Sequence, residues 1–410
     1  MRKGFLSQYF EGIAVKRLGA VEVNTSVSNQ HEFNGSKPLR NLLGDERRTS
    51  CNARFLWLGG ENEGISSDGK ITWYDARERH PTRSEYRLYF NRNDVMSLAK
   101  ENDLLIVARR PGEEFFIVVV RADSTLENQL LWLFGIDDQI GFSFNFQSIE
   151  NGHNPEIDYA VRYILEELGI EIEEPDTDVL DTLLEPFIIS GQFPTTSEFS
   201  DLARRTLTDV SPVEDPDLAL LKWMEHEEKL FKRLERHIIL RKLEQGFRDN
   251  ESVDVDGFLR FSLSVHNRRK SRVGYALENH LEEIFKVHKI TYSRTAVTEN
   301  KSRPDFLFPG IKFYHDPVFP PSRLTMLGVK STCKDRWRQV LAEANRIKTK
   351  HLLTLEPGIS ENQTDEMQAN DLQLVLPQLL HDTYKPKQRE WLINLSNFIS
   401  IVRERQADKR

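Results

Sequence analysis

The chain is poor in cysteine and has no long apolar segment. Only two cysteines, Cys51 and Cys333, occur among 410 residues, too few and too far apart for a disulfide framework or a cysteine-based metal cluster. No run approaches the roughly 18 consecutive apolar residues of a membrane helix. The first residues, MRKGFLSQYFEG, also lack the apolar core of a secretory signal. The sequence therefore predicts a cytoplasmic protein without a membrane segment.

Positive charge and zinc motifs are also missing. The formal net charge is −8, which argues against a protein that coats nucleic acid indiscriminately. The 11 histidines form no HExxH or paired CxxC pattern, so a zinc enzyme is disfavoured. Charge is nevertheless uneven, because residues 268–272 are basic and residues 169–181 are acidic. A basic cleft on an acidic body leaves sequence-specific DNA binding open.

What is present is an ordinary globular composition and enough length for two domains. The chain is 39% apolar and 29% charged. Its 410 residues are more than one hydrophobic core usually accommodates, so two domains are expected. Residues 1–172 are predicted to form a mainly β domain, a barrel or sandwich, with helices at 93–100 and 156–168. The predicted strands are 12–18, 54–58, 71–74, 86–90, 104–107, 115–120 and 130–134, with turns at 59–62, 66–69 and 111–113.

The second half of the chain has an α/β pattern. The acidic stretch 173–182 shows no core pattern and is predicted to be a linker, followed by a domain at 183–410. An amphipathic helical pattern runs from 218 to 243 and suits a core-supporting or partner-packing helix. Further predicted elements are helices at 273–288 and 387–403, and strands at 306–308, 324–329, 351–355 and 372–376. Their order predicts a four- or five-stranded mixed sheet flanked by helices.

Two polar residues mark strand boundaries in this domain, and a third lies on the predicted helix that follows. Asp305 precedes the apolar run 306–308, and Lys330 ends the run 324–329. The segment after Lys330 has helical periodicity and carries Glu343. Each residue alone is more often a solvated surface residue. Together they suit metal-assisted hydrolysis of a phosphodiester, because carboxylates hold Mg²⁺ and a lysine orients or deprotonates the attacking water.

The whole stretch resembles a known family of nucleases. The runs VKSTCKDRWRQVLAEA, HNRRKSRVGYALENHLEEIF, RPDFLFP and YHDPVFP are similar to the EcoRII-like type II restriction endonucleases, a branch of the PD-(D/E)XK superfamily. The superfamily usually has an acid two residues before the lysine, where this chain has Gly328, and the EcoRII-like branch replaces it with an acid at the position of Glu343. The resemblance implies that Asp305 and Glu343 are metal ligands and Lys330 is the catalytic lysine. Tyr314 also matches an active-site position of the family.

The predicted helix 273–288 adds a further candidate acid. Glu278 lies next to its apolar face, either as a solvated helix edge or as the first-helix acid that points into the metal site in this superfamily. Arg268, Lys270 and Arg272 come just before the predicted start of this helix. A basic entry to a helix is a natural site for phosphate, so we expect these three residues to bind DNA.

A possible base-reading cluster follows Lys330. Lys334, Asp335 and Arg336 open the predicted helix that carries Glu343, and they match the family's base-reading positions. Arginine and lysine donate to guanine, and an acid accepts from the cytosine amino group. Recognition and catalysis on one helix would couple the two. The alternative is that Asp335 caps the helix and the arginines lie on a solvated face.

The N-terminal half contains an arginine-rich segment. Residues 74–87 form either a solvated hairpin or a DNA-contacting loop. The family has an N-terminal DNA-binding pseudobarrel that captures a second, effector copy of the recognition site. By position, Arg83, Glu85 and Arg87 match its effector-DNA contacts, whereas Tyr86 stands where the family has a lysine.

The resemblance implies a type II restriction endonuclease, of type IIE. Such an enzyme is a Mg²⁺-dependent homodimer that cuts both strands of DNA at a site built on CC and GG, such as CCWGG. A cognate DNA methyltransferase would be its companion, and effector DNA bound to the N-terminal domain would relieve autoinhibition. Two alternatives stay open: a modification-dependent endonuclease, and a non-catalytic DNA-binding protein with a decayed nuclease fold.

Overall fold

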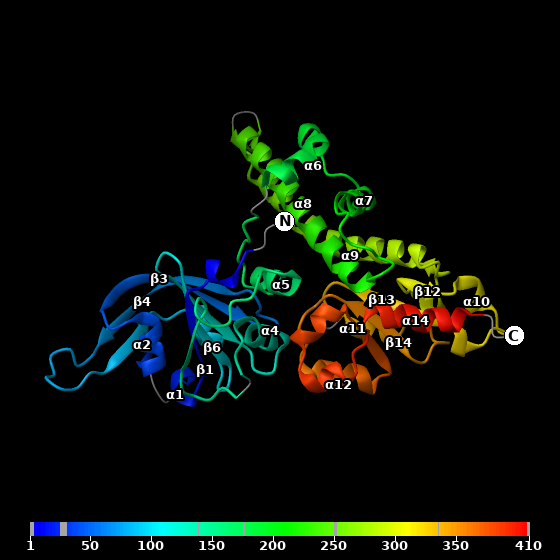
Figure 1. Cartoon of the computed structure of the whole chain (residues 1–410). Helices are drawn as coiled ribbons and strands as arrows, with labels where there is room; N and C mark the ends of the chain where they lie inside the picture. The colour runs from blue at the N-terminus through cyan, green and yellow to red at the C-terminus, as the bar shows by residue number, and fades with distance from the viewer. Residues whose placement is uncertain are drawn as a thin grey trace. The chain divides into compact units, whose positions relative to one another are not determined.

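The computed structural model describes residues 4–24, 31–137, 139–174, 177–249, 252–334 and 336–407. The chain forms two compact units (Figure 1). The first runs to Ile172 and includes Pro357–Gln363, and the second comprises Glu173–Glu356 and Thr364–Arg410. Within the described ranges, the helices are all too short or too polar to cross a membrane.

The first unit is built on one eight-stranded sheet in the order β2-β5-β4-β3-β7-β6-β1-β8. Neighbouring strands are antiparallel except β3 and β7, which are parallel. The β-rich character of this unit is confirmed, but the strand order ends at β2 and β8, so the described strands form one open sheet and not the expected barrel or sandwich. The strands are β1 (Gly12–Arg17), β2 (Glu32–Gly35), β3 (Arg48–Leu58), β4 (Ser66–Asp75), β5 (Tyr86–Phe90), β6 (Leu104–Arg110), β7 (Glu114–Val120) and β8 (Asn145–Ser148).

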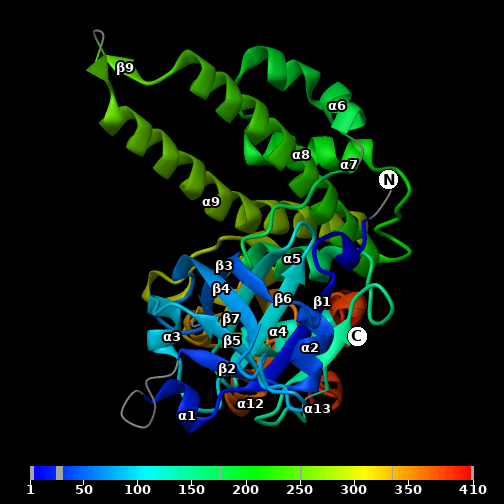
Figure 2. The same cartoon turned by 90° about the vertical axis from the view of Figure 1, so that its left-hand side faces the viewer.

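Both faces of this sheet are covered by helices (Figure 2). Alternate residues of β6 enter different cores: Leu104 and Ile106 join one, and Leu105 and Val107 the other. Helices α4 (Thr125–Phe134) and α5 (Tyr159–Glu167) pack on the first face, and α2 (Lys37–Leu43) and α3 (Asp94–Leu98) on the second. The short α1 (Ala20–Val23) follows β1.

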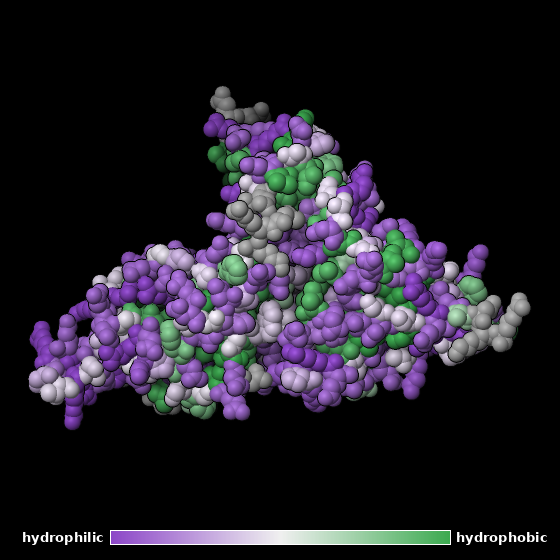
Figure 3. Space-filling model, in the orientation of Figure 1, coloured by the Kyte–Doolittle hydropathy of each residue, from purple (hydrophilic) through white to green (hydrophobic). Residues whose placement is uncertain are grey.

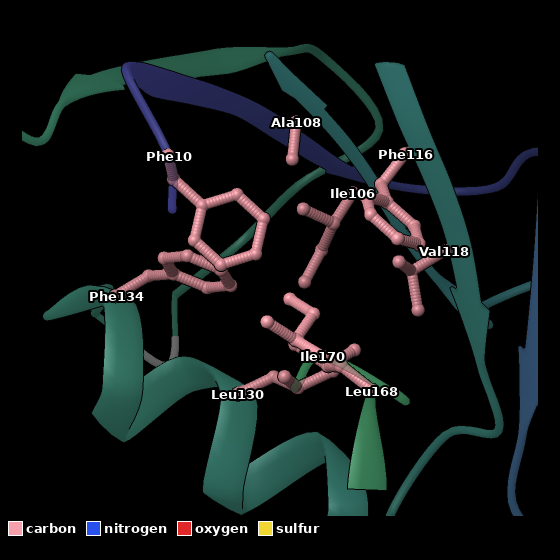
Figure 4. A pocket seen from close by; sticks show the side chains of 9 residues that line it. All are labelled: Phe10, Ile106, Ala108, Phe116, Val118, Leu130, Phe134, Leu168 and Ile170. Atoms are coloured by element: carbon pink, nitrogen blue, oxygen red, sulfur yellow. The ribbon is translucent and has the colours of Figure 1, made fainter. Parts of the chain in front are cut away.

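A small cavity lies in the core beneath α4 (Figure 4). Its lining is entirely apolar and includes Phe10 and Phe134, whose rings meet edge to face at 5.3 Å. No polar group lines it to orient a ligand, so the cavity is a packing defect of the core.

Two local predictions for this unit are wrong. The apolar run 130–134 is the end of α4, which begins at a Ser124 cap that accepts a hydrogen bond from the amide of Glu127. Residues 66–69 are not a turn but the start of β4, because Ser66 and Ser67 pair with Leu56 and Phe55 of β3. In both cases tertiary pairing and capping outweigh the local pattern.

The second unit contains a five-stranded mixed sheet, as expected. Its order is β11-β12-β13-β14-β15, with β11 to β13 antiparallel and β13 to β15 parallel. The strands are β11 (Ser293–Arg294), β12 (Phe306–Phe308), β13 (Thr325–Lys330), β14 (Lys350–Thr354) and β15 (Leu372–Val375). The helices beside them are α10 (Ile311–His315), α11 (Trp337–Leu341), α12 (Glu361–Ala369), α13 (Pro386–Arg389) and α14 (Leu395–Gln406). The predicted helix 387–403 is therefore divided into α13 and α14.

A long helix, α9 (Val255–Val287), connects this sheet to a helical part of the unit. Phe285 of α9 packs against Phe306 and Phe308 of β12, with ring centroids 5.1 and 5.2 Å apart. At its other end α9 follows α8 (Pro216–Gln245) through the two-residue strands β9 (Arg248–Asp249) and β10 (Ser252–Val253). Helices α6 (Thr177–Ser190) and α7 (Thr196–Thr206) pack with α8.

The predicted linker is shorter than expected. Helix α6 begins at Thr177, inside the stretch 173–182, and Leu180 is buried in a core with Phe231 of α8. Asp181 accepts hydrogen bonds from Arg233 Nε at 2.6 Å and His237 Nε2 at 2.8 Å. The Arg233 guanidinium in particular lowers the pKa of Asp181 to about 2. The acidic stretch is thus partly structural, because one of its acids pairs with bases on α8.

Candidate active site

The antiparallel pairing of β12 and β13 brings Asp305 next to Lys330. Phe306, which follows Asp305, is in register with Leu327, three residues before Lys330. Asp305 Oδ2 accepts hydrogen bonds from the Val329 amide at 2.6 Å and from Lys330 Nζ at 3.1 Å. The sheet therefore places the first acid and the lysine together at the end of β13.

Glu343 joins this pair from a turn, whereas the sequence had predicted that it lies on a helix. Helix α11 ends at Leu341, and Ala344 has a positive φ of 50°, so the helical periodicity seen in the sequence does not continue through Glu343. Burial raises the pKa of Glu343 to about 7, the charge of Asp305 adds to this, and Lys330 opposes it. Glu343 Oε2 is buried and has no hydrogen-bond partner among the described residues.

Gly328 explains why the acid comes from elsewhere in the chain. A Cβ atom at this position would lie 2.8 Å from Cγ2 of Val340, on α11. Val340 of α11 thus occupies the space that a side chain at residue 328, two residues before the lysine, would need. An acidic side chain has no room there unless α11 moves.

Glu278 lies on α9 and is held by an arginine. Arg294 donates to Glu278 Oε2 from Nη2 at 2.9 Å and from Nε at 3.2 Å. Burial raises the pKa of Glu278, the Arg294 hydrogen bond opposes the shift, and the negative charge of Asp305 adds to it. The carboxylate is therefore paired, largely buried and within electrostatic reach of Asp305, unlike a solvated helix edge.

The donor set fits a hard divalent cation. Asp305, Glu343 and Glu278 offer carboxylate oxygens only, which Mg²⁺ and Ca²⁺ prefer. The buried, unpartnered Glu343 Oε2 is the kind of atom that a cation would satisfy. In the described part of the chain, no three His, Cys, Asp or Glu side chains are close enough together to form a complete protein cage. Such a cation would therefore need water or phosphate oxygens as well.

Tyr314 lies on α10 and is engaged with Glu299, a residue that the sequence reasoning missed. Its hydroxyl donates to Glu299 Oε2 at 2.6 Å and Oε1 at 2.8 Å, and accepts from the Arg346 amide at 3.3 Å. Burial and the Glu299 carboxylate raise the pKa of Tyr314 to about 12. Glu299 lies in a short helical turn, Glu299–Lys301, where no motif or periodicity marks it.

The predicted basic entry to a helix is wrong. Arg268, Lys270 and Arg272 lie inside α9, which starts at Val255 because Asp254 caps it. Arg272 is buried and forms ion pairs with Glu227 and Glu228, so it is not available to phosphate. Arg268 is exposed and stacks on Phe193 at 4.1 Å, and Lys270 is also exposed.

Two residues of the predicted base-reading cluster, Lys334 and Arg336, lie just before α11. Lys334 and Arg336 are exposed, and the amide of Arg336 donates to the Cys333 carbonyl at 2.7 Å. Asp335 lies outside the described residues. Because α11 comprises only Trp337–Leu341, no single helix carries both this cluster and Glu343. The predicted coupling through one helix is therefore wrong, although both segments flank the same short helix.

In the first unit, Arg83, Glu85 and Arg87 belong to the hairpin that joins β4 and β5. Glu85 accepts from Arg77 Nε at 2.5 Å and from Arg87, which also binds Asn34. Arg83 is exposed, and its amide donates to His80 Nδ1 at 3.1 Å. Figure 3 shows hydrophilic side chains over this hairpin. The hairpin therefore presents Arg83 to solvent and ties up Glu85 and Arg87 in ion pairs.

Comparison with known proteins identifies the domain that contains the Asp305–Lys330 pair. Residues 231–399 match the family of the EcoRII C-terminal domain. The type II restriction enzyme EcoRII of Escherichia coli is 43% identical over 195 residues, which cover 47% of each chain. The match to this curated relative therefore spans about half its length.

The solved structures found to be similar include two complexes with DNA. Metal-depleted Ecl18kI with uncleaved DNA has a TM-score of 0.44 and 17% identity, and covers 57% of this chain and 88% of that chain. A PspGI–substrate DNA complex has a TM-score of 0.39 and 14% identity, and covers 59% and 94%. The N-terminal domain of Helicobacter pylori LlaJI.R1 has a TM-score of 0.22 and 9% identity, and covers 33% and 97%.

Proposed function

We propose that this protein is a type II restriction endonuclease that hydrolyses both strands of DNA with Mg²⁺. The main support is the Asp305–Lys330 pair beside Glu343, whose Oε2 atom is buried and unpartnered among the described residues, within a region that matches the EcoRII C-terminal family. Water attacks the phosphorus atom, the bond from phosphorus to the 3′ oxygen breaks, and a 5′-phosphate and a 3′-hydroxyl remain.

The residues have distinct roles in this proposal. Asp305 and Glu343 would hold the cation, which when bound polarises the phosphate and lowers the pKa of water. Lys330, fixed by its 3.1 Å bond to Asp305, orients the attacking water and offsets negative charge on the phosphate. Glu278, held by Arg294, adds a further carboxylate to the same region.

Cleavage of unmethylated phage DNA in Mg²⁺ tests this function. Wild-type protein should give discrete fragments, and Lys330→Ala should lower the cleavage rate at least about 100-fold, because one preorganised charge near the reacting phosphate is removed. Lys348→Ala is the matched control, since Lys348 is 86% exposed and makes only a 3.8 Å contact with Asp371. Equal rates for wild type and Lys330→Ala would contradict the assignment.

Two arms of the same assay address the alternatives. Cleavage of methylated DNA but not of unmethylated DNA would favour a modification-dependent endonuclease. DNA binding without cleavage of either substrate would favour a non-catalytic DNA-binding protein.

We further propose a recognition site built on CC and GG, such as CCWGG, read by Lys334, Asp335 and Arg336. The exposed Lys334 and Arg336 suit donation to guanine. Arg336→Ala should weaken discrimination between cognate and mismatched duplexes by about 1–3 kcal/mol in binding free energy. Discrimination equal to that of wild type would exclude this role. A cognate methyltransferase is then needed to protect host DNA.

The first unit is proposed to bind an effector copy of DNA through Arg83, Glu85 and Arg87. The exposed Arg83 and the hydrophilic hairpin support this role. A short cognate duplex added in trans should stimulate cleavage of a single-site substrate if the first unit is inhibitory until it binds DNA. Arg83→Ala should reduce that stimulation, and stimulation equal to that of wild type would exclude Arg83 from the effector site.

A further inference from the structure

The turn that carries Glu343 has little regular structure of its own. It follows a helix of five residues, and Ala344 adopts a φ of 50°. Local backbone hydrogen bonds here include those from the Glu343 amide to the Val340 carbonyl at 3.1 Å and from the Ile347 amide to the Ala344 carbonyl at 2.9 Å. A metal ligand on such a turn needs support from outside it, because coordination requires a fixed oxygen position.

That support comes from Glu299 and Tyr314. Glu299 Oε2 accepts from the amide of Asn345 at 3.4 Å, and the Tyr314 hydroxyl accepts from the amide of Arg346 at 3.3 Å. The same hydroxyl donates to both Glu299 oxygens. Two consecutive amides, two and three residues after Glu343, are thus bound by one carboxylate–tyrosine pair. We call this pair and its two amide contacts the Glu299–Tyr314 latch.

The latch is anchored in the protein core and by a second link. Tyr314 is only 1% exposed. The Arg346 side chain donates to the Tyr314 carbonyl, to the Asp316 carbonyl at 2.9 Å and to the Phe319 carbonyl at 2.7 Å. The turn is therefore tied to the end of α10 by backbone and side chain together. A Glu299 carboxylate that accepts several donors makes charge-assisted hydrogen bonds, which are stronger than neutral ones.

We propose that Glu299 and Tyr314 are positioning residues that hold the turn so that the Glu343 carboxylate stays beside Asp305. Tyr314 then acts through Glu299 and not on the reacting atoms. The inference rests on the proposed function, because Glu343 is a metal ligand only in that proposal.

The test compares wild type with Glu299→Ala, Tyr314→Phe and the double variant. Cleavage rate is measured against Mg²⁺ concentration, and DNA affinity is measured separately in Ca²⁺. Each single variant should raise the Mg²⁺ concentration for half-maximal rate about 10-fold, as outer-shell partners of metal ligands do. DNA affinity should stay within about 2-fold of wild type, since no DNA contact is removed. Glu404→Ala, an exposed acid on α14, is the control.

The double variant separates positioning from direct catalysis. If the pair acts as one unit, the double variant should be no slower than the slower of the two single variants, because either change breaks the Tyr314–Glu299 hydrogen bonds that hold the two amide contacts together. Glu299→Gln should recover part of the loss, since its amide oxygen still accepts from Asn345. A further fall in rate at saturating Mg²⁺ when Tyr314→Phe is added to Glu299→Ala would overturn the positioning role.

Hydrogen exchange of the Asn345 and Arg346 amides gives a readout that does not need activity. Both amides should exchange at least about 10-fold faster in Glu299→Ala than in wild type, because the latch protects them. Unchanged exchange would overturn the inference, whatever the cleavage result. If wild type cleaves no DNA while exchange changes as expected, the proposed function fails and the latch stands as a structural device.

Discussion

At the scale of a single residue, the protonation of Glu343 would compete with metal binding if Glu343 is a ligand, as proposed above. Its pKa of about 7, raised mainly by burial from the usual 4.5, means that the folded metal-free protein holds a proton there that the unfolded chain releases. Below pH 4.5 both states are protonated. As the pH rises through 7, the unfolded state gains relative stability, so this contribution to folding is lost.

Glu343→Gln should therefore flatten the pH dependence of stability. Without metal, the free energy of unfolding of wild type should fall by about 2 kcal/mol more than that of the variant between pH 5 and pH 8, after allowance for the partial exposure of the carboxylate. Denaturant titrations in EDTA at both pH values measure this. Parallel pH profiles for the two proteins would show that Glu343 is not buried as described.

Residue-level roles differed in how far the sequence could predict them. The Asp305–Lys330 pair was predictable because Asp305 directly precedes one recognisable apolar run and Lys330 ends another. Glu299 was not, since its position depends on loops whose paths carry no periodic signal. Arg272 was misplaced for a related reason: a basic run looks solvated in sequence, and only the partners Glu227 and Glu228 on α8 reveal that it is buried.

At the scale of elements, the contact between β13 and α11 depends on Gly328. Gly328→Ala places a methyl group 2.8 Å from Val340 Cγ2, where no contact of that length is tolerated. Overpacking should lower the free energy of unfolding by about 1–3 kcal/mol. Adding Val340→Ala should recover part of the loss, because the opposing atoms are gone. Purely additive losses in a denaturant titration would argue against this packing.

The ion pair between α6 and α8 should give a second pH-dependent contribution. Arg233 and His237 hold the pKa of Asp181 at about 2, below its usual value of 3.8. The contribution of this ion pair to the free energy of unfolding is therefore fully present above pH 3.8 and is lost as the pH falls through 2. Asp181→Asn should cost about 2 kcal/mol of unfolding free energy at pH 7 and much less at pH 2. Asp365→Asn, at an exposed 3.5 Å pair with Lys387, is the control. An equal loss at both pH values would contradict the linkage.

Element boundaries were less predictable than element types. The mixed sheet followed from apolar runs and their order. Helix α9 is much longer than the predicted 273–288, and its first half was missed because it exposes a mixture of polar and apolar side chains without a clear apolar face. Helix α11 is shorter than predicted, since Ala344 leaves the helical region although alanine favours helices. Tertiary contacts of the following turn outweigh that local preference.

At the scale of the whole molecule, we expect a homodimer formed through the helical hairpin of α8 and α9. Figure 3 shows hydrophobic side chains among the helices near α6 and α8. Several large apolar side chains there are more than one-third exposed: Leu240, Leu243, Val253, Val255, Phe258, Leu259 and Leu263. Apolar side chains grouped in this way are typical of an association surface.

Leu259→Asp combined with Leu263→Asp should therefore shift the protein to monomer. The two residues lie one turn apart on α9 and are 51% and 61% exposed, so charges there disturb association more than folding. Analytical ultracentrifugation at micromolar concentration measures the change. Val318→Asp, at an 85% exposed position in the loop after α10, is the control. A wild-type monomer at these concentrations would refute the expectation.

Helix α9 is 33 residues long, so a small tilt at one end gives a large displacement at the other. Leu259 near its start and Glu278 near its end are separated by about 28 Å of continuous helix, at about 1.5 Å per residue. A tilt of about 5° at the hairpin would displace Glu278 by about 2.5 Å, comparable to a metal–oxygen distance. Any contact that fixes the orientation of the hairpin would therefore also fix the position of the Glu278 carboxylate, which Arg294 holds near Asp305. Dimer formation and DNA cleavage would then both depend on the orientation of α9.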